Sequence, residues 1–277
     1  MVIKAVLRDV AFSPNSVEAD REILKLTAQK VGKSLSTQVD FINEPLLDEC
    51  SITRSQHSHN ARTLWLSMAR SEKAMVFLSD RQHDGDWVVN SPKSIRACRR
   101  SNLHRLMRQH RLPVAPEKGK YGYWIKRGDQ AAQSAQDVVY VENEAQADKI
   151  KEEFQRLGIN EIVVSAHVPG DLIKFYGVEG SDFFRLFYPT AEGHSKFGNE
   201  RRNGLPHYYH FDHNSLRQAA EQTARLTETV VYGGDAIVDA GGSFYIIDFN
   251  DWPSFSKCRD DAAEAIAGRI LTLCCTQ

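Results

Sequence analysis

The 277-residue chain carries 35 Lys and Arg against 36 Asp and Glu, and 42% of its residues are hydrophobic. This balance offers no field to attract nucleic acid or an anionic membrane, and no stretch approaches the roughly 18 apolar residues of a membrane span. The five cysteines lack the paired spacing of zinc ligands, so we expect a reduced, cytoplasmic, globular protein.

The first 90 residues predict strands that alternate with helices. Residues 2–7 and 36–42 have the pattern of strands, and residues 16–31 have near-helical apolar spacing behind the capping residues Asn15 and Ser16. Residues 61–70 predict a second helix, and residues 73–78 a third strand. The order β-α-β-α-β indicates a small parallel α/β lobe.

The remainder of the chain predicts a different architecture. A basic helix begins at Pro92, and the strands after residue 160 follow one another as hairpins, which is typical of antiparallel α+β structure. A final amphipathic helix is expected from about residue 259 to 273. We therefore expect three domains, with the boundaries 1–90, 91–168 and 169–277.

The stretch "YIIDFNDWPSF" places polar side chains inside an apolar strand. Because side chains alternate between the two faces, Asp248 and Asn250 should share one face, and Ile247 and Phe249 the other. A solvated strand end before a proline turn is the simplest interpretation. A carboxylate on a half-buried strand is nevertheless costly unless it is paired, hydrogen-bonded or metal-bound. Asp235, on the preceding strand, would lie beside Asp248 in a hairpin.

Two lysines on apolar strands add cations to these oxygen ligands. Lys126 ends "YGYWIK" and Lys174 lies within "DLIKFYGV". Each by itself is typical of a strand-edge lysine. Together with the acids they match the needs of a nucleoside triphosphate, whose phosphates require cations and whose Mg²⁺ requires oxygen ligands.

At this point the chain resembles the ATP-grasp superfamily, and in particular its glutathione synthetase-like and ribosomal-protein glutamate ligase-like members. "GGDAIVDAGGSFYIIDFNDWP" is similar to their "gvD… vlEvN..P" signature, and "NSPKSIRACRRSNLHRLMRQHRLPVAP" resembles their linker helix. "YWIKR" and "VVSAHVPGDLIKFYGV" resemble their phosphate-lysine strand and adenine hinge. The resemblance covers roughly residues 85 to 277. It implies a mixed α/β and α+β fold, in which a small N-terminal parallel α/β lobe is followed by two α+β subdomains that enclose ATP.

The resemblance also implies a set of site residues. The Mg²⁺ ligands would be Asp235, Asp248 and Asn250. Because the family's Asp-Lys pair is replaced by Arg100-Ser101, an arginine of the linker helix (Arg99, Arg100 or Arg105) would take over from the missing lysine. The expected ATP-binding residues are Arg100, Arg105, Lys126, Ser165, Ala166, His167, Val168, Asp171 and Lys174.

The implied activity is ATP-dependent carboxylate–amine ligation through an acyl phosphate, on a small acidic or peptide-like substrate. The cations and the amide that would contact this substrate or the acyl phosphate are Arg185, Lys196, Arg201, Arg202 and Asn203.

Two alternatives remain open. "HVPGDLIKFYGV" with "IIDFNDWPSF" also resembles the inositol-trisphosphate kinase branch, which would make the protein a small-molecule kinase with His167 facing its substrate. The single glycine of "RGDQAAQSAQD" and the missing lysine instead favour a degenerate nucleotide-binding module. The sequence identifies neither the substrates nor the oligomeric state. A homo-oligomer stays open.

Overall fold

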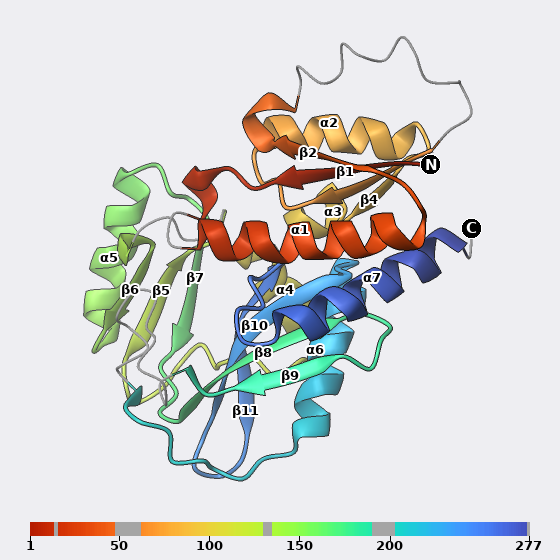
Figure 1. The fold of residues 1–277 in the computed structure, drawn as a ribbon. Helices are drawn as coiled ribbons and strands as arrows, with labels where there is room; N and C mark the ends of the chain where they lie inside the picture. The colour runs from red at the N-terminus through yellow and green to blue at the C-terminus, as the bar shows by residue number, and fades with distance from the viewer. Residues whose placement is uncertain (14–15, 48–61, 130–134, 190–202, 276–277) are drawn as a thin grey trace.

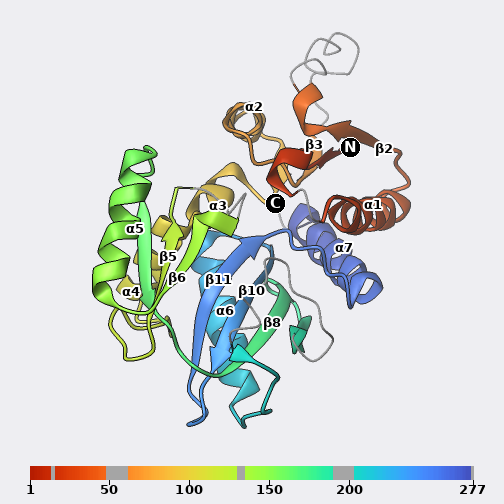
Figure 2. The ribbon, with the colours of Figure 1, turned by 90° about the vertical axis from the view of Figure 1, so that its left-hand side faces the viewer.

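A computed structural model describes residues 1–13, 16–47, 62–129, 135–189 and 203–275. Its strands form a parallel sheet in the order β2-β1-β3-β4 and two antiparallel sheets in the orders β6-β5-β7 and β11-β10-β8-β9. The expected mixed α/β and α+β class is therefore confirmed. Figures 1 and 2 show the parallel sheet as a separate lobe above the two antiparallel sheets. None of the described helices combines the length and the apolar character needed to span a membrane.

The N-terminal lobe holds the parallel sheet between helices. Its elements are β1 (Val2–Leu7), a 3-10 turn (Val10–Phe12), α1 (Val17–Ser34), β2 (Val39–Asn43), a second 3-10 turn (Glu44–Leu46), β3 (Thr63–Ser67), α2 (Glu72–His83) and β4 (Trp87–Val89).

The prediction for residues 61–78 is wrong, because strand and helix are exchanged there. β3 is buried on both faces, because Leu64 and Leu66 lie in the core that includes α1 and Trp65 lies in the core that includes α2, so its apolar residues run without alternation. Such a run cannot be distinguished from a buried helix by periodicity. The helix begins later, where the Ser71 side chain accepts a hydrogen bond from the backbone N–H of Ala74.

The predicted linker helix is two helices, α3 (Pro92–Ala97) and α4 (Arg100–Gln109). The break falls at Arg99, whose extended backbone forms the N-cap of α4. Helix α4 then packs Leu103 and Met107 against the core of the C-terminal sheet. The break directs the first residue of α4, Arg100, toward the end of β5, where its side chain bonds the carbonyl of Arg127.

The central sheet consists of β5 (Tyr123–Arg127), β6 (Val138–Val141) and β7 (Ile162–Ala166), with a 3-10 turn at Ala135–Asp137 and α5 (Glu144–Arg156) on one face. Tyr123 and Ile125 belong to the core beneath α5. Strand alternation therefore places Trp124 and Lys126 on the opposite face, toward β11.

The C-terminal sheet consists of β8 (Asp171–Val178), β9 (Phe184–Phe187), β10 (Val231–Val238) and β11 (Phe244–Asp251), followed by α7 (Arg259–Cys275). Helix α6 (His213–Thr227) covers the face that carries Phe175 and Phe249. Helix α7 leaves this sheet and lies beside α1, so one apolar core joins the N-terminal lobe to the C-terminal sheet (Figures 1 and 2). The three sheets fall within the three expected ranges, and the domain boundaries stay a prediction.

Candidate nucleotide and metal site

A β-bulge in β11 sets the direction of its side chains. Asp235 pairs with Asp248, whereas the next residue, Ala236, pairs with Ile246, so Ile247 is the extra residue. Ile246 is 3% exposed and Phe249 0% exposed, while Ile247 is only half-buried. The expectation that Ile247 shares a face with Phe249 is therefore wrong, because one inserted residue reverses the alternation.

Lys174, Asp235 and Asp248 form a row across three strands. Each is the cross-strand neighbour of the next, on the sheet face opposite α6. The Lys174 ammonium lies 2.9 Å from the Asp235 carboxylate, which raises the pKa of the lysine. Asn250 continues the row, since its Nδ2 donates to Asp248 Oδ2 at 3.1 Å. Asp248 and Asn250 thus share one face as expected.

Two cations that face this row from β5 and α4, Lys126 and Arg100, complete the cluster. Lys126 Nζ donates to the carbonyl of the bulge residue Ile247 at 3.0 Å. Burial, reinforced by Arg100, lowers the pKa of Lys126 to about 8. Arg100 donates to the carbonyl of Arg127 at 2.7 Å, and its Nη2 lies 4.0 Å from Asp248 Oδ1. Burial alone would raise the pKa of Asp248, but Arg100 and Lys126 outweigh it and hold that pKa below its usual value.

The donor atoms of this cluster suit a hard divalent cation. Mg²⁺ prefers carboxylate and amide oxygens and retains other oxygen ligands from phosphate or water. The side chains of Asp235 and Asp248 are 25% and 31% exposed, so both can exchange their present partners for an ion. The described residues contain no cluster of three His, Cys, Asp or Glu side chains able to hold a metal. Asn250 and ligands from outside the protein would thus have to complete the coordination.

Two cavities meet at Arg100 and Asp248. One, of about 40 Å³, lies between α4, the central sheet and β11, and Lys126 and Ser165 line it. The other, of about 420 Å³, opens toward the N-terminal lobe and includes Asn250. The weak Arg100–Asp248 pair therefore stands at the junction between a small cavity lined by Lys126 and a larger one.

The same three-sheet arrangement occurs in solved structures. The chain is similar to the D-alanyl-alanine synthetase A of Vibrio cholerae O1 biovar eltor, with TM-score 0.64, 12% identity, and coverage of 100% of this chain and 97% of that one. It is also similar to the D-alanine–D-alanine ligase of Bacillus anthracis complexed with ATP, with TM-score 0.60, 11% identity and 98% of both chains covered. A RimK domain protein ATP-grasp of Sphaerobacter thermophilus gives TM-score 0.60 at 17% identity, covering 98% and 100%.

The chain has the ATP-grasp fold. These alignments span nearly the whole of each protein, so the likeness includes the N-terminal lobe as well as the two antiparallel sheets. No protein-family model matches the sequence, and no curated protein does. The fold is therefore recognised through the structure and through short motifs, whereas overall sequence similarity is weak.

The predicted adenine hinge of the ATP-grasp site lies at the end of β7. Ser165 is buried and lines the smaller cavity. The backbone N–H of Ala166 donates to Pro116, and that of His167 to Gly122, so both donors are already engaged. Val168, which follows, is half-buried. The hinge role of these four residues stays a prediction.

An aromatic group not anticipated from the sequence adjoins this hinge. Trp124 Nε1 donates to His167 Nδ1 at 3.1 Å, and both rings pack edge-on against Tyr140. Trp124 shares its strand face with Lys126. The clue in the sequence was the alternation of "YWIK", which puts the tryptophan and the lysine on the same side.

Three other predicted residues lie outside this cluster. Arg105 bonds Asn102 on the exposed side of α4 and Arg99 pairs with Glu72, so of the three proposed substitutes Arg100 is the one that reaches Asp248. Asp171 is 2% exposed and accepts the backbone N–H groups of His207 and Tyr209, which secures the loop before α6. Arg185 contacts Asp261 on α7 and lies over the Phe183 ring.

The predicted substrate loop is only partly described. Lys196, Arg201 and Arg202 lie outside the described residues. Asn203 is half-buried at the start of the segment that leads to α6, and its Oδ1 is buried without a hydrogen-bond partner among the described residues. Catalytic roles for these four residues stay predictions.

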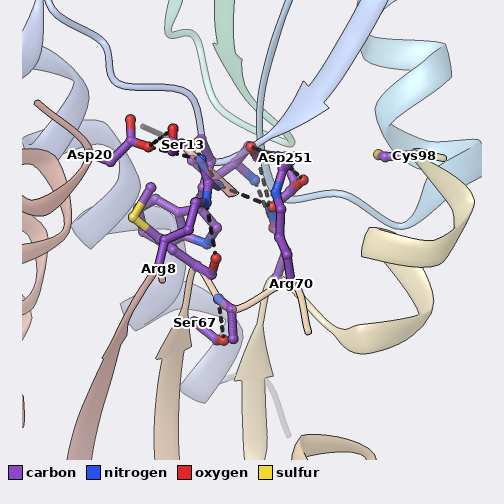
Figure 3. Close-up of polar contacts among 12 residues, drawn as sticks. Arg8, Ser13, Asp20, Ser67, Arg70, Cys98 and Asp251 are labelled. Atoms are coloured by element: carbon purple, nitrogen blue, oxygen red, sulfur yellow. Dashed lines mark hydrogen bonds and ion pairs between the residues drawn. The ribbon is translucent and has the colours of Figure 1, made fainter. Parts of the chain in front are cut away.

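A second charged cluster joins the end of β11 to the N-terminal lobe (Figure 3). The sequence analysis did not anticipate it. Asp251 is 2% exposed, with Arg70 Nη2 at 2.6 Å and Arg8 Nη2 at 3.6 Å from its carboxylate oxygens. Arg8 also pairs with the buried Asp20 at 3.0 Å and donates to the carbonyl of Trp252. Two arginines of the lobe thus fix the residue that directly follows Asn250.

Proposed function

We propose that this protein is an ATP- and Mg²⁺-dependent carboxylate–amine ligase that works through an acyl phosphate on a small acidic or peptide-like substrate. The observation that carries the proposal is the convergence of Lys126 and Arg100, on one side of the cleft, with the acids of β10 and β11 on the other. The fold and the names of its structural neighbours, two of them ligases that join D-alanine, support the same class.

The chain's own residues would act by positioning and by neutralising charge. Lys126, Lys174 and Arg100 would contact the phosphates of ATP, since each is a cation directed into the cleft. Asp235, Asp248 and Asn250 would hold Mg²⁺, which when bound withdraws charge from the phosphates. Transfer of a phosphoryl group to a carboxylate needs alignment and electrostatic stabilisation rather than a protein nucleophile. This accords with a cleft built from cations and oxygen ligands.

A second candidate function is nucleotide binding without turnover, and one observation favours it. The cavity that Lys126 lines holds only about 40 Å³, which is much less than a nucleoside triphosphate requires. Under the ligase proposal, the central sheet therefore has to separate from β11 when ATP binds. A site that stays closed would bind nucleotide weakly or not at all.

The first test is a screen of amino acids and short peptides for stimulated ADP release, with Mg²⁺ present and with a chelator. The ligase proposal expects free phosphate that depends on both a carboxylate and an amine, and on Mg²⁺. Phosphate transferred to a polyol would instead indicate a kinase. ATP binding without any turnover would support the second candidate.

Asn250→Ala is the variant that tests the metal role. Loss of one electrostatic contact in a phosphoryl-transfer site costs about a hundredfold in turnover. Because Asn250 is half-buried and its amide donates to the half-buried Asp248, the melting temperature without nucleotide should change little. ADP release and thermal melting measure the two effects. A variant that melts early yet turns over normally when folded would show that Asn250 is structural.

A further inference from the structure

A groove of about 510 Å³ borders β7 between α4 and α5, apart from the cluster around Asp248. β7 is an edge strand in the order β6-β5-β7, and Ile162, Val163 and Val164 line the groove. Helix α5 lies on the sheet face that carries Tyr123, whereas α4 lies on the opposite face, toward β11. The groove therefore opens onto the free edge of a sheet, with one helix on each side of the sheet plane.

A hydrogen bond next to β7 shows which of its backbone groups point outward. Gly128 N–H donates to the carbonyl of Glu161 at 2.7 Å, which fixes residue 161 as bonded toward the β5 side. Because bonded positions alternate along an antiparallel pair, Ile162 and Val164 turn their N–H and C=O groups away from β5. These groups face the groove.

The open edge is short. The next outward residue of β7, Ala166, already donates its N–H to the carbonyl of Pro116 at 2.7 Å. Ile162 and Val164 are left to present an N–H and a C=O group each to the groove. Such unpaired groups of an edge strand form a template on which another extended chain can pair.

The cations of the groove differ in how they are paired. Lys118 and Lys151 lie 3.8 and 2.9 Å from acids of α5. On the α4 side, Arg105 donates to the neutral amide of Asn102, and no carboxylate of the described residues lies within ion-pairing distance of its guanidinium. Burial lowers the pKa of the nearby His104, so its imidazole is neutral at pH 7. The α4 wall therefore carries one uncompensated positive charge.

An added strand would place a defined side chain beside this charge. In either strand direction, the peptide residue opposite Val163 has its side chain on the same face as Val163. That face is the side of α4, because Val163 also borders the cavity between α4 and β11. The two neighbouring peptide residues turn toward α5, where Ala147 lines the groove. The groove thus favours one acidic side chain with uncharged residues on either side.

We propose that this groove docks a short extended segment of a partner polypeptide as an additional strand on β7, with an Asp or Glu opposite Val163 that contacts Arg105. A second copy of this chain fits less well, because antiparallel pairing of two β7 strands joins equivalent faces and brings like charges together. The inference does not depend on ligase activity, since the groove lies outside the candidate nucleotide and metal site.

Binding of three blocked pentapeptides to the full chain, measured by calorimetry without nucleotide, tests the proposal. The first has Glu between two threonines on each side, because threonine favours extended structure. The second has Gln in place of Glu, and should bind about threefold more weakly, as expected for an ion pair at an exposed position. The third is N-methylated at Glu and at both neighbours, and should bind about tenfold or more weakly, since it lacks the N–H groups that β7 would accept. Equal binding of all three would overturn the proposal.

Variants of Arg105 locate the acidic side chain. Arg105→Ala should reduce the affinity of the Glu peptide to that of the Gln peptide and leave the Gln peptide unchanged. Lys149→Ala, which removes an exposed cation of α5 outside the groove, is the matched control and should preserve the difference between the peptides. If Arg105→Ala weakened both peptides equally, the assigned contact would be wrong.

Val164→Pro tests the strand pairing itself. Proline removes the outward N–H and leaves the bonds of β7 to β5, so it should weaken the Glu peptide about tenfold or more. Hydrogen exchange of the unaltered chain keeps the test valid if this variant does not fold, because the bound peptide should protect the amide of Val164. An unprotected Val164 amide with peptide bound, or a chain dimer in sedimentation that the peptide dissociates, would contradict the inference.

Discussion

The end of strand β11 contributes to two charge clusters that differ in burial, although their acids, Asp248 and Asp251, lie close together in the sequence. The side chain of Asp248 is 31% exposed and lines a cavity together with Arg100. Asp251, in contrast, is 2% exposed and is enclosed by Arg8 and Arg70. A half-exposed carboxylate can exchange one partner for another at little cost, because water screens the intermediate state. A buried carboxylate cannot, because an unpaired charge there is strongly unfavourable. Two acids three positions apart are thus a candidate ligand and a structural anchor.

The largest effect should come from removing the anchor. Asp251→Ala leaves two arginines facing each other in the interior, and loss of one partner of a buried pair costs about 3–5 kcal/mol of unfolding free energy. Urea denaturation measures this loss. Asp248→Asn, at the half-exposed position, is the matched control and should change stability much less. Comparable losses in both variants would remove the distinction between the clusters.

The β-bulge gives the next test, because it decides which side chain of β11 is in the core. Ile246→Ala should cost about 2–5 kcal/mol through the cavity that it leaves, since Ile246 is 3% exposed. Ile247→Ala, at the half-buried bulge position, should cost clearly less. Denaturation of the two variants side by side checks the register. The reverse order would mean that the bulge is placed wrongly.

Two of the three proposed substitutes for the missing lysine, Arg100 and Arg105, should differ in their effect on ATP binding. Arg100→Ala should weaken ATP binding by roughly 1.5–3 kcal/mol, the value of a charge-assisted contact. Arg105→Ala should have little effect, because its guanidinium bonds Asn102 on the exposed side of α4. Titration of ATP into each variant measures the difference. Unchanged affinity in the Arg100 variant would favour a module that does not use this cleft for phosphate.

The smallest effect is a pH dependence of ATP binding, measured with a chelator so that no metal contributes. Burial and Arg100 lower the pKa of Lys126 to about 8, so its charge, and with it the attraction for phosphate, is present below that pH. Between pH 7 and 9 the affinity should fall about tenfold, since each unit above the pKa removes a factor of ten in the charged form. Lys126→Arg, which stays charged, should show no such fall.

The same lysine makes an opposite contribution to stability, which sharpens the test. Its pKa in the folded state lies below the ordinary lysine value of 10.5, so the unfolded state binds more protons between pH 8 and 10.5. The contribution of this group to the unfolding free energy therefore rises with pH in that window. Affinity and stability that moved together with pH would show that another group is responsible.

Much of the fold was predictable where local periodicity agrees with the final environment. The hairpins after residue 160, α1 and α7 follow from alternation and helical spacing, and the shared face of Asp248 and Asn250 follows from the strand period. The prediction failed at β3, because a strand buried on both faces loses its alternation. It failed again at Ile247, because a bulge depends on the partner strand β10 rather than on β11.

What the sequence determined by itself is the inventory of chemistry: two lysines and three oxygen ligands, on strands, in an order that resembles ATP-grasp proteins. Tertiary structure alone decided which of these side chains lie together. It brought Arg100 rather than Arg105 to Asp248, and it brought Arg8 and Arg70 to Asp251 from positions far apart along the chain. The physical reason is that periodicity reports only which face a side chain occupies, whereas burial and charge pairing depend on which distant segment covers that face.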